Sequence, residues 1–208
     1  MEKRLNQSSE LYKGNQGFTL IELMVTLAVA SIFLLAVIQL FISTNQVNTI
    51  QEQLAGTQQN IRVSMELISR DIRMAGLDPT GGAGNAGFYD DGDDERDTDS
   101  NSIAIRYDLN GDGNCDVDRV YYYNAANERL MVREGGTNRS LTEDGTISSV
   151  TFSYTLDDDS VDDDPSGNGN LADIRVVSVQ VCGKITGAFE DVHTATYCFS
   201  NTVRPRNM

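Results

Sequence analysis

The sequence has few of the residues from which catalytic and zinc sites are built. It contains one histidine, His193, and its three cysteines form no CxxC pair, so a zinc site would lack ligands. It also has no glycine-rich phosphate loop after an expected strand and no nucleophile motif. We therefore predict that the protein is not an enzyme.

Basic residues are also scarce. Lys and Arg number 16 against 31 Asp and Glu, which gives a formal net charge of −15 at pH 7. Nucleic-acid phosphates are bound through Lys and Arg, so this balance disfavours direct binding to nucleic acid. An acidic surface of this size is compatible with divalent cations.

Charge is absent altogether from the stretch between Leu23 and Gln51. The apolar part of this region is longer than the roughly 20 residues that a helix needs to cross a bilayer. Glu22 lies near its start, and a carboxylate inside lipid is expected to be functional and to have a cationic partner. A cut between Gly17 and Phe18 would create that cation. The new amino group would lie within reach of Glu22 of its own chain or of a neighbouring subunit, and such a pair would select assembly.

The segment GFTLIE, residues 17–22, and the apolar helix after it resemble the processing site of class III signal peptides. These signals are found on type IV pilins and on type II secretion pseudopilins. The resemblance implies that prepilin peptidase cuts after Gly17, that the new N-terminal residue Phe18 is methylated, and that Glu22 acts in assembly. Two alternatives are an ordinary signal anchor that carries a glutamate and a secretory signal peptide cut after Ala30.

This processing divides the first part of the chain into a leader peptide, residues 1–17, and a transmembrane or filament-core helix, residues 18–43. Apolar residues then recur three or four positions apart, which predicts an amphipathic helix over residues 44–75. They are Val47, Ile50, Leu54, Ile61, Met65, Ile68, Ile72 and Ala75. The charged residues of this helix are expected to be largely solvated, namely Glu52, Arg62, Glu66, Arg70, Asp71 and Arg73. A coiled-coil stalk is the alternative, but too few consecutive heptads remain to favour it.

Residues 76–208 are predicted to form a β-rich globular domain that faces the periplasm or the exterior. Gly76 and Pro79 end the helix, and short strands separated by turns follow. The strand candidates are residues 102–107, 119–124, 130–134, 149–156, 174–183 and 194–203. The expected fold class is α+β, with a long N-terminal helix packed by its second half on an antiparallel β-sheet, as in pilins. The acidic runs at 88–100 and 157–164 are expected to be solvated, mobile loops, with a further metal site as the alternative for the second run.

The segment DLNGDGNCD, residues 108–116, carries the sharpest motif outside the apolar helix. Oxygen-bearing side chains alternate and a glycine takes the sixth position, as in the first three quarters of an EF-hand loop. Arg119 stands where an EF-hand has its bidentate glutamate, so we expect a shorter, Asp-rich calcium loop. The predicted ligands are Asp108, Asn110, Asp112, Asn114, Asp116 and Asp118. The alternative is a polar hairpin turn that binds no metal.

Cys182 and Cys198 lie on consecutive strand candidates that are joined by a loop. In an oxidising periplasm we predict a disulfide between them, worth about 3 kcal/mol for a loop of this length. Similar C-terminal disulfide loops occur in many pilins. Cys115 would be left unpaired or would compete for one of these partners.

Later segments are most similar to minor pilins of the PilW type and next to J-type pseudopilins of type II secretion. They are the Asp-rich loop followed by RVYYY, then LMVRE, SVTFSY, IRVVSVQV and TVRPRN. Both groups are low-abundance filament subunits that help to initiate assembly. The retained Glu22 argues against a K-type pseudopilin, which typically lacks that acid.

The resemblance also implies partners and a location. The partners are prepilin peptidase, other major and minor pilin subunits, and the inner-membrane assembly machinery. The chain is expected to cross the bacterial inner membrane once, with its C-terminal domain in the periplasm, before it enters a pilus or pseudopilus. From a different class, the alternative is a membrane-anchored, calcium-dependent adhesin that does not polymerise.

Overall fold

The longest element is α1, a continuous helix of 55 residues over Leu20–Met74, close to the predicted range of 18–75. The computed structural model describes residues 17–90, 97–184 and 196–208. The predicted leader therefore lies outside the described residues except for Gly17. Contacts divide the chain into two units, Met1–Asn48 and Thr49–Met208, with the boundary inside α1.

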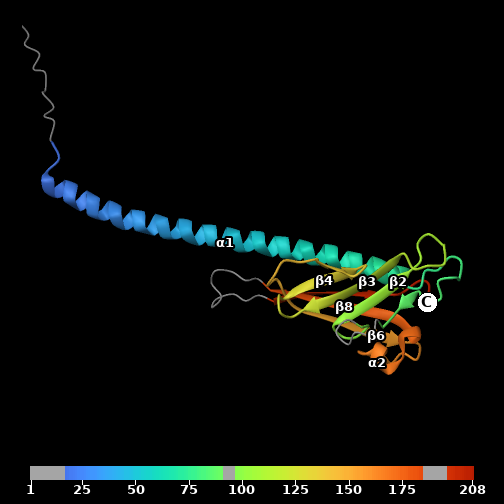
Figure 1. Cartoon of the computed structure of the whole chain (residues 1–208). Helices are drawn as coiled ribbons and strands as arrows, with labels where there is room; N and C mark the ends of the chain where they lie inside the picture. The colour runs from blue at the N-terminus through green and yellow to red at the C-terminus, as the bar shows by residue number, and fades with distance from the viewer. Residues whose placement is uncertain (1–16, 91–96, 185–195) are drawn as a thin grey trace, which may run out of the picture. The chain divides into compact units, whose positions relative to one another are not determined.

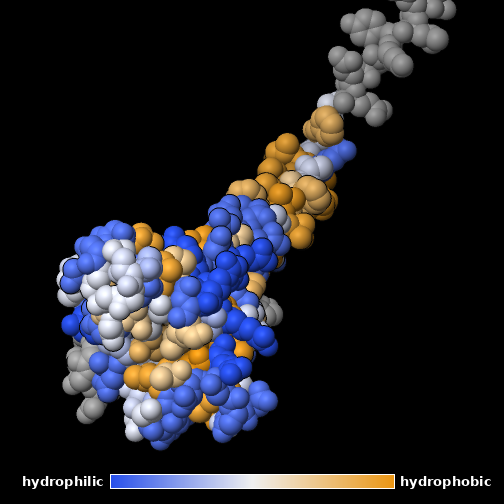
Figure 2. All heavy atoms as spheres, turned by 90° about the vertical axis from the view of Figure 1, so that its right-hand side faces the viewer, coloured by the Kyte–Doolittle hydropathy of each residue, from blue (hydrophilic) through white to orange (hydrophobic). Residues whose placement is uncertain are grey.

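In the first unit, α1 exposes many large apolar side chains, and Figure 2 shows them along the face of the helix that is in view. All residues from Gly17 to Asn45 are exposed, including Phe18 and Phe41. A helix that is apolar all round belongs in lipid or inside other protein. Among the described residues, α1 is the one helix that is long and apolar enough to cross a membrane.

Three hydroxyl groups of this apolar stretch are satisfied by the helix itself. Thr26 donates to Leu23 O at 2.9 Å, Ser31 lies 3.2 Å from Ala28 O, and Thr44 donates to Leu40 O at 2.8 Å. Such bonds to carbonyls three or four residues earlier satisfy hydroxyls within one helix.

The second unit contains two antiparallel sheets in place of the one sheet that was predicted. Sheet A has the order β1-β2-β3-β4-β5 and sheet B the order β7-β6-β8-β9. Figure 1 shows β2, β3 and β4 in one layer and β6 and β8 in another. The strands of sheet A are β1 (Gly87–Phe88), β2 (Ser102–Tyr107), β3 (Val117–Asn124), β4 (Arg129–Glu134) and β5 (Thr137–Ser140). Those of sheet B are β6 (Ile147–Leu156), β7 (Val161–Asp162), β8 (Ile174–Lys184) and β9 (Thr196–Val203).

The predicted strands all occur, with described ends that differ by no more than two residues; residues 194 and 195 of the last candidate lie outside the described residues. Five short elements were not predicted: β1, β5, β7, the helix α2 (Pro165–Asn168) and the 3₁₀ turn η1 (Leu171–Asp173). Each has two to four residues, which is too short for a hydrophobic period to show in the sequence.

The core of the second unit lies between α1 and the two sheets. The predicted apolar face of α1 is buried from Ile61 to Ala75, whereas Ile50 and Leu54 are half-buried. Val47, which belongs to the first unit, is 49% exposed. Buried residues opposite this face include Ile103 of sheet A and Phe152 of sheet B, so both sheets contribute to one core.

The acidic run at 157–164 is largely exposed, as predicted, and it contains the short strand β7 and local turns. Asp162 Oδ1 accepts a bond from Asp164 N at 2.9 Å, and Asp164 Oδ1 accepts one from Gly167 N at 2.9 Å. These bonds form an Asx turn and the N-cap of α2, so the acids shape the backbone. In the first run, Asp99 Oδ1 bonds to the backbone N–H of Asn101 and Ser102 in the same way, and residues 91–96 lie outside the described residues.

The C-terminal tail returns to the end of α1. Gly76 ends the helix as predicted, with the left-handed φ of 76° that favours glycine after a helix. The tail then contributes Arg206 N, which donates to Arg73 O at 3.3 Å. A carbonyl of the last helical turn, which has no partner inside the helix, is satisfied in this way.

Candidate functional site

The predicted assembly residue Glu22 lies in the first turn of α1, and the predicted processing residues Gly17 and Phe18 lie just before the helix. Thr19 caps the helix because its Oγ1 accepts a hydrogen bond from Glu22 N at 3.3 Å. Thr19 and Glu22 therefore have the spacing of a capping box, and Glu22 stands in the first turn, where the helix dipole favours an acid. The chain before the cap, Gly17 and Phe18, is exposed, with Phe18 at 82%.

The Glu22 carboxylate has no ion pair or hydrogen bond to another described side chain, and it is exposed on an apolar helix. An ionised carboxylate in lipid or in a protein interior requires a cation. The Phe18 amino group that a cut after Gly17 would release stands just before the cap, on the same end of the helix. This turn can therefore present one negative and one positive group to a neighbouring molecule.

The segment of residues 108–116 closes on itself through its own acids. Asp108, which is fully buried, accepts bonds from Gly111 N at 2.7 Å and Gly113 N at 3.0 Å. Asp116 Oδ2 accepts bonds from the N–H groups of Leu109 and Asn110, both at 2.9 Å. All the predicted ligands except Asp118 thus gather in one loop between β2 and β3, where most of their oxygens accept bonds from the loop's own N–H groups.

Two of the predicted ligands, Asp112 and Asp118, accept hydrogen bonds from other side chains. Hydrogen bonds from Asn114 and Asn110 lower the pKa of Asp112, so this carboxylate is ionised at neutral pH. Asp118 lies on β3 and pairs instead with Arg106, 3.0 Å away, and with the Tyr89 hydroxyl. Within the described residues, no group of three or more acidic, histidine or cysteine side chains is placed to hold a metal ion. Calcium binding by this loop stays a prediction.

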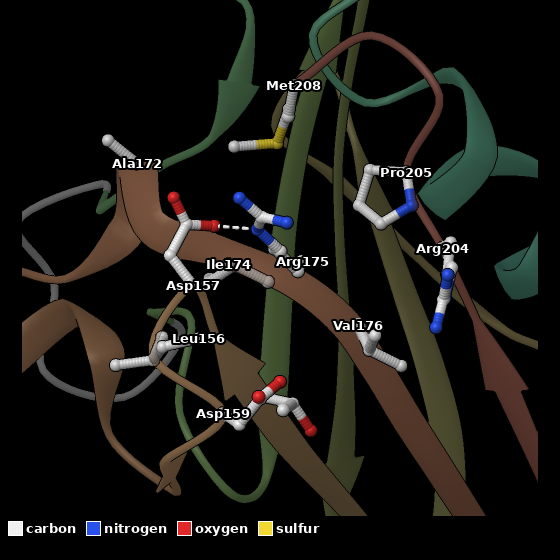
Figure 3. A pocket seen from close by; sticks show the side chains of 11 residues that line it. Leu156, Asp157, Asp159, Ala172, Ile174, Arg175, Val176, Arg204, Pro205 and Met208 are labelled. Carbon is white, nitrogen blue, oxygen red and sulfur yellow. Dashed lines mark hydrogen bonds and ion pairs between the residues drawn. The ribbon is translucent and has the colours of Figure 1, made fainter.

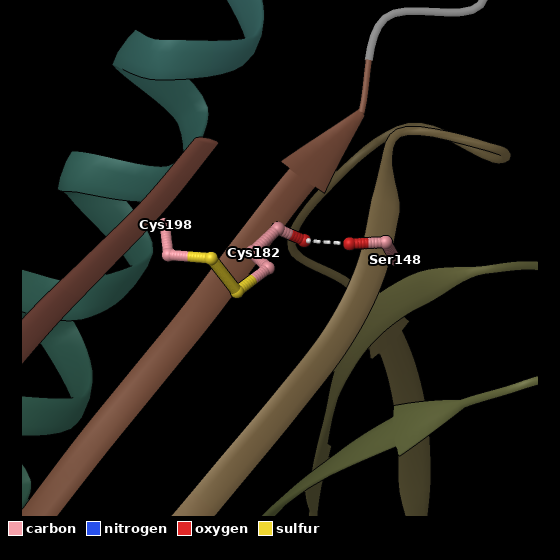
Figure 4. The surroundings of a disulfide bond; sticks show 3 residues. All are labelled: Ser148, Cys182 and Cys198. Carbon is pink, nitrogen blue, oxygen red and sulfur yellow. Dashed lines mark hydrogen bonds between the residues drawn. A yellow bond between two sulfur atoms is a disulfide. The ribbon is translucent and has the colours of Figure 1, made fainter. Parts of the chain in front are cut away.

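In sheet B, Cys182 and Cys198 form a disulfide (Figure 4). They are direct partners in the register of β8 and β9, with their Cα atoms 4.0 Å apart. The bond therefore fastens the edge strand β9 to the central strand β8. Cys115 is free and half-buried, and its Sγ lies 3.3 Å from Asn85 Oδ1. Burial raises the pKa of the Cys115 thiol.

Comparison with known families assigns both parts of the chain. The prokaryotic N-terminal methylation motif matches residues 12–38, which include Gly17, Phe18 and Glu22. The family of prepilin peptidase-dependent protein B matches residues 50–204, about three quarters of the chain. The chain belongs to the prepilin peptidase-dependent protein B family. Comparisons with curated proteins and with solved structures gave no match.

Membership of the prepilin peptidase-dependent protein B family, together with the methylation motif, makes this a type IV pilin-like protein. Such families are structural and not enzymatic. The motif and the apolar first half of α1 indicate membrane anchoring. The long helix packed on antiparallel sheets agrees with a pilin-like fold.

One buried charge of this prepilin peptidase-dependent protein B was not predicted. Asp71 was expected to be solvated, but it is fully buried where α1 meets sheet A. Its carboxylate accepts bonds from Arg119 Nη1 at 2.8 Å, from the Tyr121 hydroxyl at 2.6 Å and from the Tyr107 hydroxyl at 3.2 Å. Arg119 also bonds to Glu134 Oε1, at 2.6 Å through Nη2. The sequence did contain an indication of this burial, because Asp71 lies three residues after Ile68 and next to Ile72, on the apolar side of the helix.

The Asp71 network changes the acidity of its members. Burial, followed by the charge of Asp71, raises the pKa of Tyr121 and of Tyr107. Burial alone would lower the pKa of Arg119, but its hydrogen bonds to Asp71 and Glu134 outweigh burial and raise it. Arg119 is therefore a permanent cation that balances the buried carboxylate, and the site is structural.

Proposed function

We propose that this protein is a minor pilin, a low-abundance subunit that takes part in the initiation and assembly of a type IV pilus. The observation that carries the proposal is the carboxylate of Glu22, which has no partner among the described side chains and lies in the first turn of an exposed apolar helix. A carboxylate in this position favours assembly over simple anchoring, because an anchor gains nothing from a charge in lipid.

The proposed sequence of events begins with prepilin peptidase. It cuts after Gly17, and the new N-terminus on Phe18 is methylated. The chain then waits in the inner membrane, with α1 in the bilayer and the second unit in the periplasm. Glu22 pairs with the N-terminal amino group of an adjacent subunit, which satisfies both charges in an apolar environment. Other proteins of the assembly machinery extract the subunit into the filament.

The first experiment is the mass and N-terminal sequence of the protein isolated from its native membrane. The expected mature chain starts at Phe18 and carries one additional methyl group on its amino nitrogen. A start at Met1 would indicate a signal anchor, and a start at Ser31 would indicate a secretory signal peptide. Either result would overturn the proposal.

The second experiment separates a filament subunit from an anchored, calcium-dependent adhesin. Glu22→Gln keeps the shape of the side chain and removes its charge, and Ser31→Ala is the matched control in the same apolar helix. We expect Glu22→Gln to remove the protein from the sheared filament fraction while it stays in the membrane, and Ser31→Ala to have no effect. Equal recovery of both variants in filaments would refute the role of Glu22.

The same experiment in cells that lack either the pilus or the type II secretion system identifies the filament. A pilus subunit is expected to leave the filament fraction only when the pilus system is absent. Loss with the secretion system instead would assign the protein to a pseudopilus.

A further inference from the structure

The chain contains two Asn-Gly pairs, Asn110-Gly111 in the loop between β2 and β3 and Asn168-Gly169 at the end of α2. An asparagine side chain closes most readily on the backbone when glycine follows it, because glycine has no Cβ to hinder the approach of its nitrogen. Both asparagines are exposed, and both glycines have a left-handed φ, 77° for Gly111 and 76° for Gly169. The two pairs therefore have the same local chemistry and differ in their surroundings.

The reactive atoms of the Asn110-Gly111 pair are each held by a partner. Gly111 N donates a hydrogen bond of 2.7 Å to the carboxylate of Asp108, which is fully buried. Asn110 Oδ1 accepts a bond from Asp112 N at 2.8 Å. Asn110 Nδ2 donates to Asp116 Oδ1 at 2.8 Å and to Asp112 Oδ2 at 3.2 Å. The backbone nitrogen, the side-chain oxygen and the amide group thus have fixed positions relative to one another.

These contacts favour an attack of Gly111 N on Cγ, the side-chain carbonyl carbon of Asn110. A carboxylate at hydrogen-bond distance from the attacking nitrogen can accept its proton. An N–H group at the carbonyl oxygen stabilises the negative charge that develops there, as in an oxyanion hole. The two bonds from Nδ2 fix the plane of the amide, so the side chain does not have to be ordered before it reacts.

The Asn168-Gly169 pair lacks the first two of these contacts among the residues that the structure describes. Gly169 N donates to Ser166 O at 3.2 Å, and a backbone carbonyl is too weak a base to take the proton. The amide nitrogen of Asn168 bonds to a carboxylate of the acidic run at 2.8 Å, as in the first pair. Figure 3 shows that Asp157 of this run is engaged elsewhere, in an ion pair with Arg175. Asn168 is therefore a reference for an exposed Asn-Gly pair without a carboxylate at its nitrogen.

We propose that Asn110 and Gly111 react with each other in the folded protein, which converts Asn110 into aspartate and isoaspartate. The bond between Gly111 N and Asn110 Cγ forms, and the bond between Cγ and Nδ2 breaks. The proton of Gly111 N passes to Asp108 and from there through water to Nδ2, which leaves as ammonia. A water molecule then opens the resulting imide ring at either of its two carbonyl groups.

The modification changes both the charge and the backbone of one loop. Residues 108–116 contain three carboxylates before the reaction and four after it. Carboxylates are ligands that calcium prefers, so the reaction alters the loop for which calcium binding is predicted. The isoaspartate product also adds a methylene group to the main chain between β2 and β3. The reaction uses this loop alone, so it stands or fails separately from processing at Gly17 and from pairing through Glu22.

The test follows both Asn-Gly pairs in one sample of the full-length protein in detergent, at neutral pH and with EDTA to keep divalent cations out of the loop. Mass spectrometry of the digested protein measures the fraction of Asn110 and of Asn168 that has exchanged its amide nitrogen for oxygen. We expect Asn110 to react about tenfold faster than Asn168 in the folded protein. In urea both pairs lose their surroundings, and we expect similar rates.

Two results of this comparison would overturn the proposal. One is an equal or lower rate at Asn110 than at Asn168 in the folded protein. The other is a lower rate at Asn110 in the folded protein than in urea, because an ordered loop would then protect this side chain and not promote its reaction.

Asp108→Asn tests the role of the carboxylate. The new side chain keeps the size and an oxygen that can accept the bond from Gly111 N, but it cannot take up the proton. We expect the rate at Asn110 to fall about tenfold and the rate at Asn168 to stay the same. Asp164→Asn, the same exchange in the turn before Asn168, is the matched control and should change neither rate.

Circular dichroism shows whether the Asp108→Asn variant keeps its fold. An unchanged rate at Asn110 in the folded variant would also overturn the proposal. If the variant does not fold, the comparison of the two pairs in the unsubstituted protein decides the question.

Discussion

The buried carboxylate of Asp71 allows the sharpest test of how the helix is held on the sheets. Asp71→Ala removes the acceptor of four groups at once, of which three are in the second unit's sheet A and the fourth is on α1 itself: Arg119, Tyr121, Tyr107 and the exposed Arg70. Removing one partner of a buried ion pair costs 3–5 kcal/mol, as an order of magnitude, because the other charge is left without compensation. Arg119 keeps its bond to Glu134, so we expect a loss of about 3 kcal/mol in the free energy of unfolding.

The assay is thermal or urea unfolding of the full chain in detergent, followed by circular dichroism. A loss of about 3 kcal/mol corresponds to roughly 6–12 °C in the melting temperature of a chain of this size. Glu66→Ala, an exposed acid on the same helix, is the control and should change the stability by less than about 0.5 kcal/mol. Asp71→Asn retains one acceptor oxygen and should fall between the two. A melting temperature for Asp71→Ala within about 2 °C of the control would refute this reasoning.

Four other predictions follow from the structure. Burial raises the pKa of Tyr107, Tyr121 and Tyr154, so the folded protein keeps these hydroxyl protons to a higher pH than the unfolded chain does. The free energy of unfolding should therefore be unaffected by these groups below about pH 10 and should fall as the pH rises further. Unfolding measured from pH 8 to 12 tests this, and a stability that does not change over that range would contradict it. Gly76→Ala places a Cβ 2.7 Å from Asn207 O and should lower the free energy of unfolding by about 2 kcal/mol. Gly81→Ala is the control, because its φ is similar but no atom lies near the new Cβ, and it should lower the free energy of unfolding by about 1 kcal/mol. Equal melting temperatures for the two variants would rule out the contact with the tail. Replacing Cys182 and Cys198 by serine opens a loop with a sequence separation of 16 and should lower the stability by about 3 kcal/mol, and unchanged denaturant midpoints would argue against a stabilising bond. If the loop at 108–116 binds calcium with the millimolar affinity of extracellular sites, calcium at 10 mM should raise the free energy of unfolding by about 1.4 kcal/mol. Asp112→Asn should abolish this increase. Equal stability in calcium and in magnesium would reject the site.

The long elements of the fold were predictable because their patterns are local. Uncharged residues from Leu23 to Gln51 and the three-four spacing up to Ala75 predicted α1 nearly to its ends. Alternation of apolar residues predicted β2 within its observed bounds, Ser102–Tyr107. The split into two sheets was not predictable in this way, because strand order depends on pairing between residues that are far apart in the chain.

The processing and assembly residues were visible in the sequence because they form one short motif, residues 17–22, that the methylation motif also covers. Asp71 was not found because its partners are distant. Arg119 lies 48 residues away and Tyr121 lies 50 residues away, so no local pattern joins them. The turns within residues 157–164 were also not predicted, because composition does not reveal the Asx turns that the acids form with the backbone.

The attachment of α1 to both sheets determines how the molecule carries load. Asp71 joins the helix to sheet A, and the bond of 2.8 Å from Asn201 Nδ2 to Ser69 Oγ joins it to β9 of sheet B. A pull along the helix axis therefore acts on both sheets and not on one alone. The disulfide then passes the force from β9 to β8, in the middle of sheet B. Tension that enters through the helix thus reaches strands of both sheets.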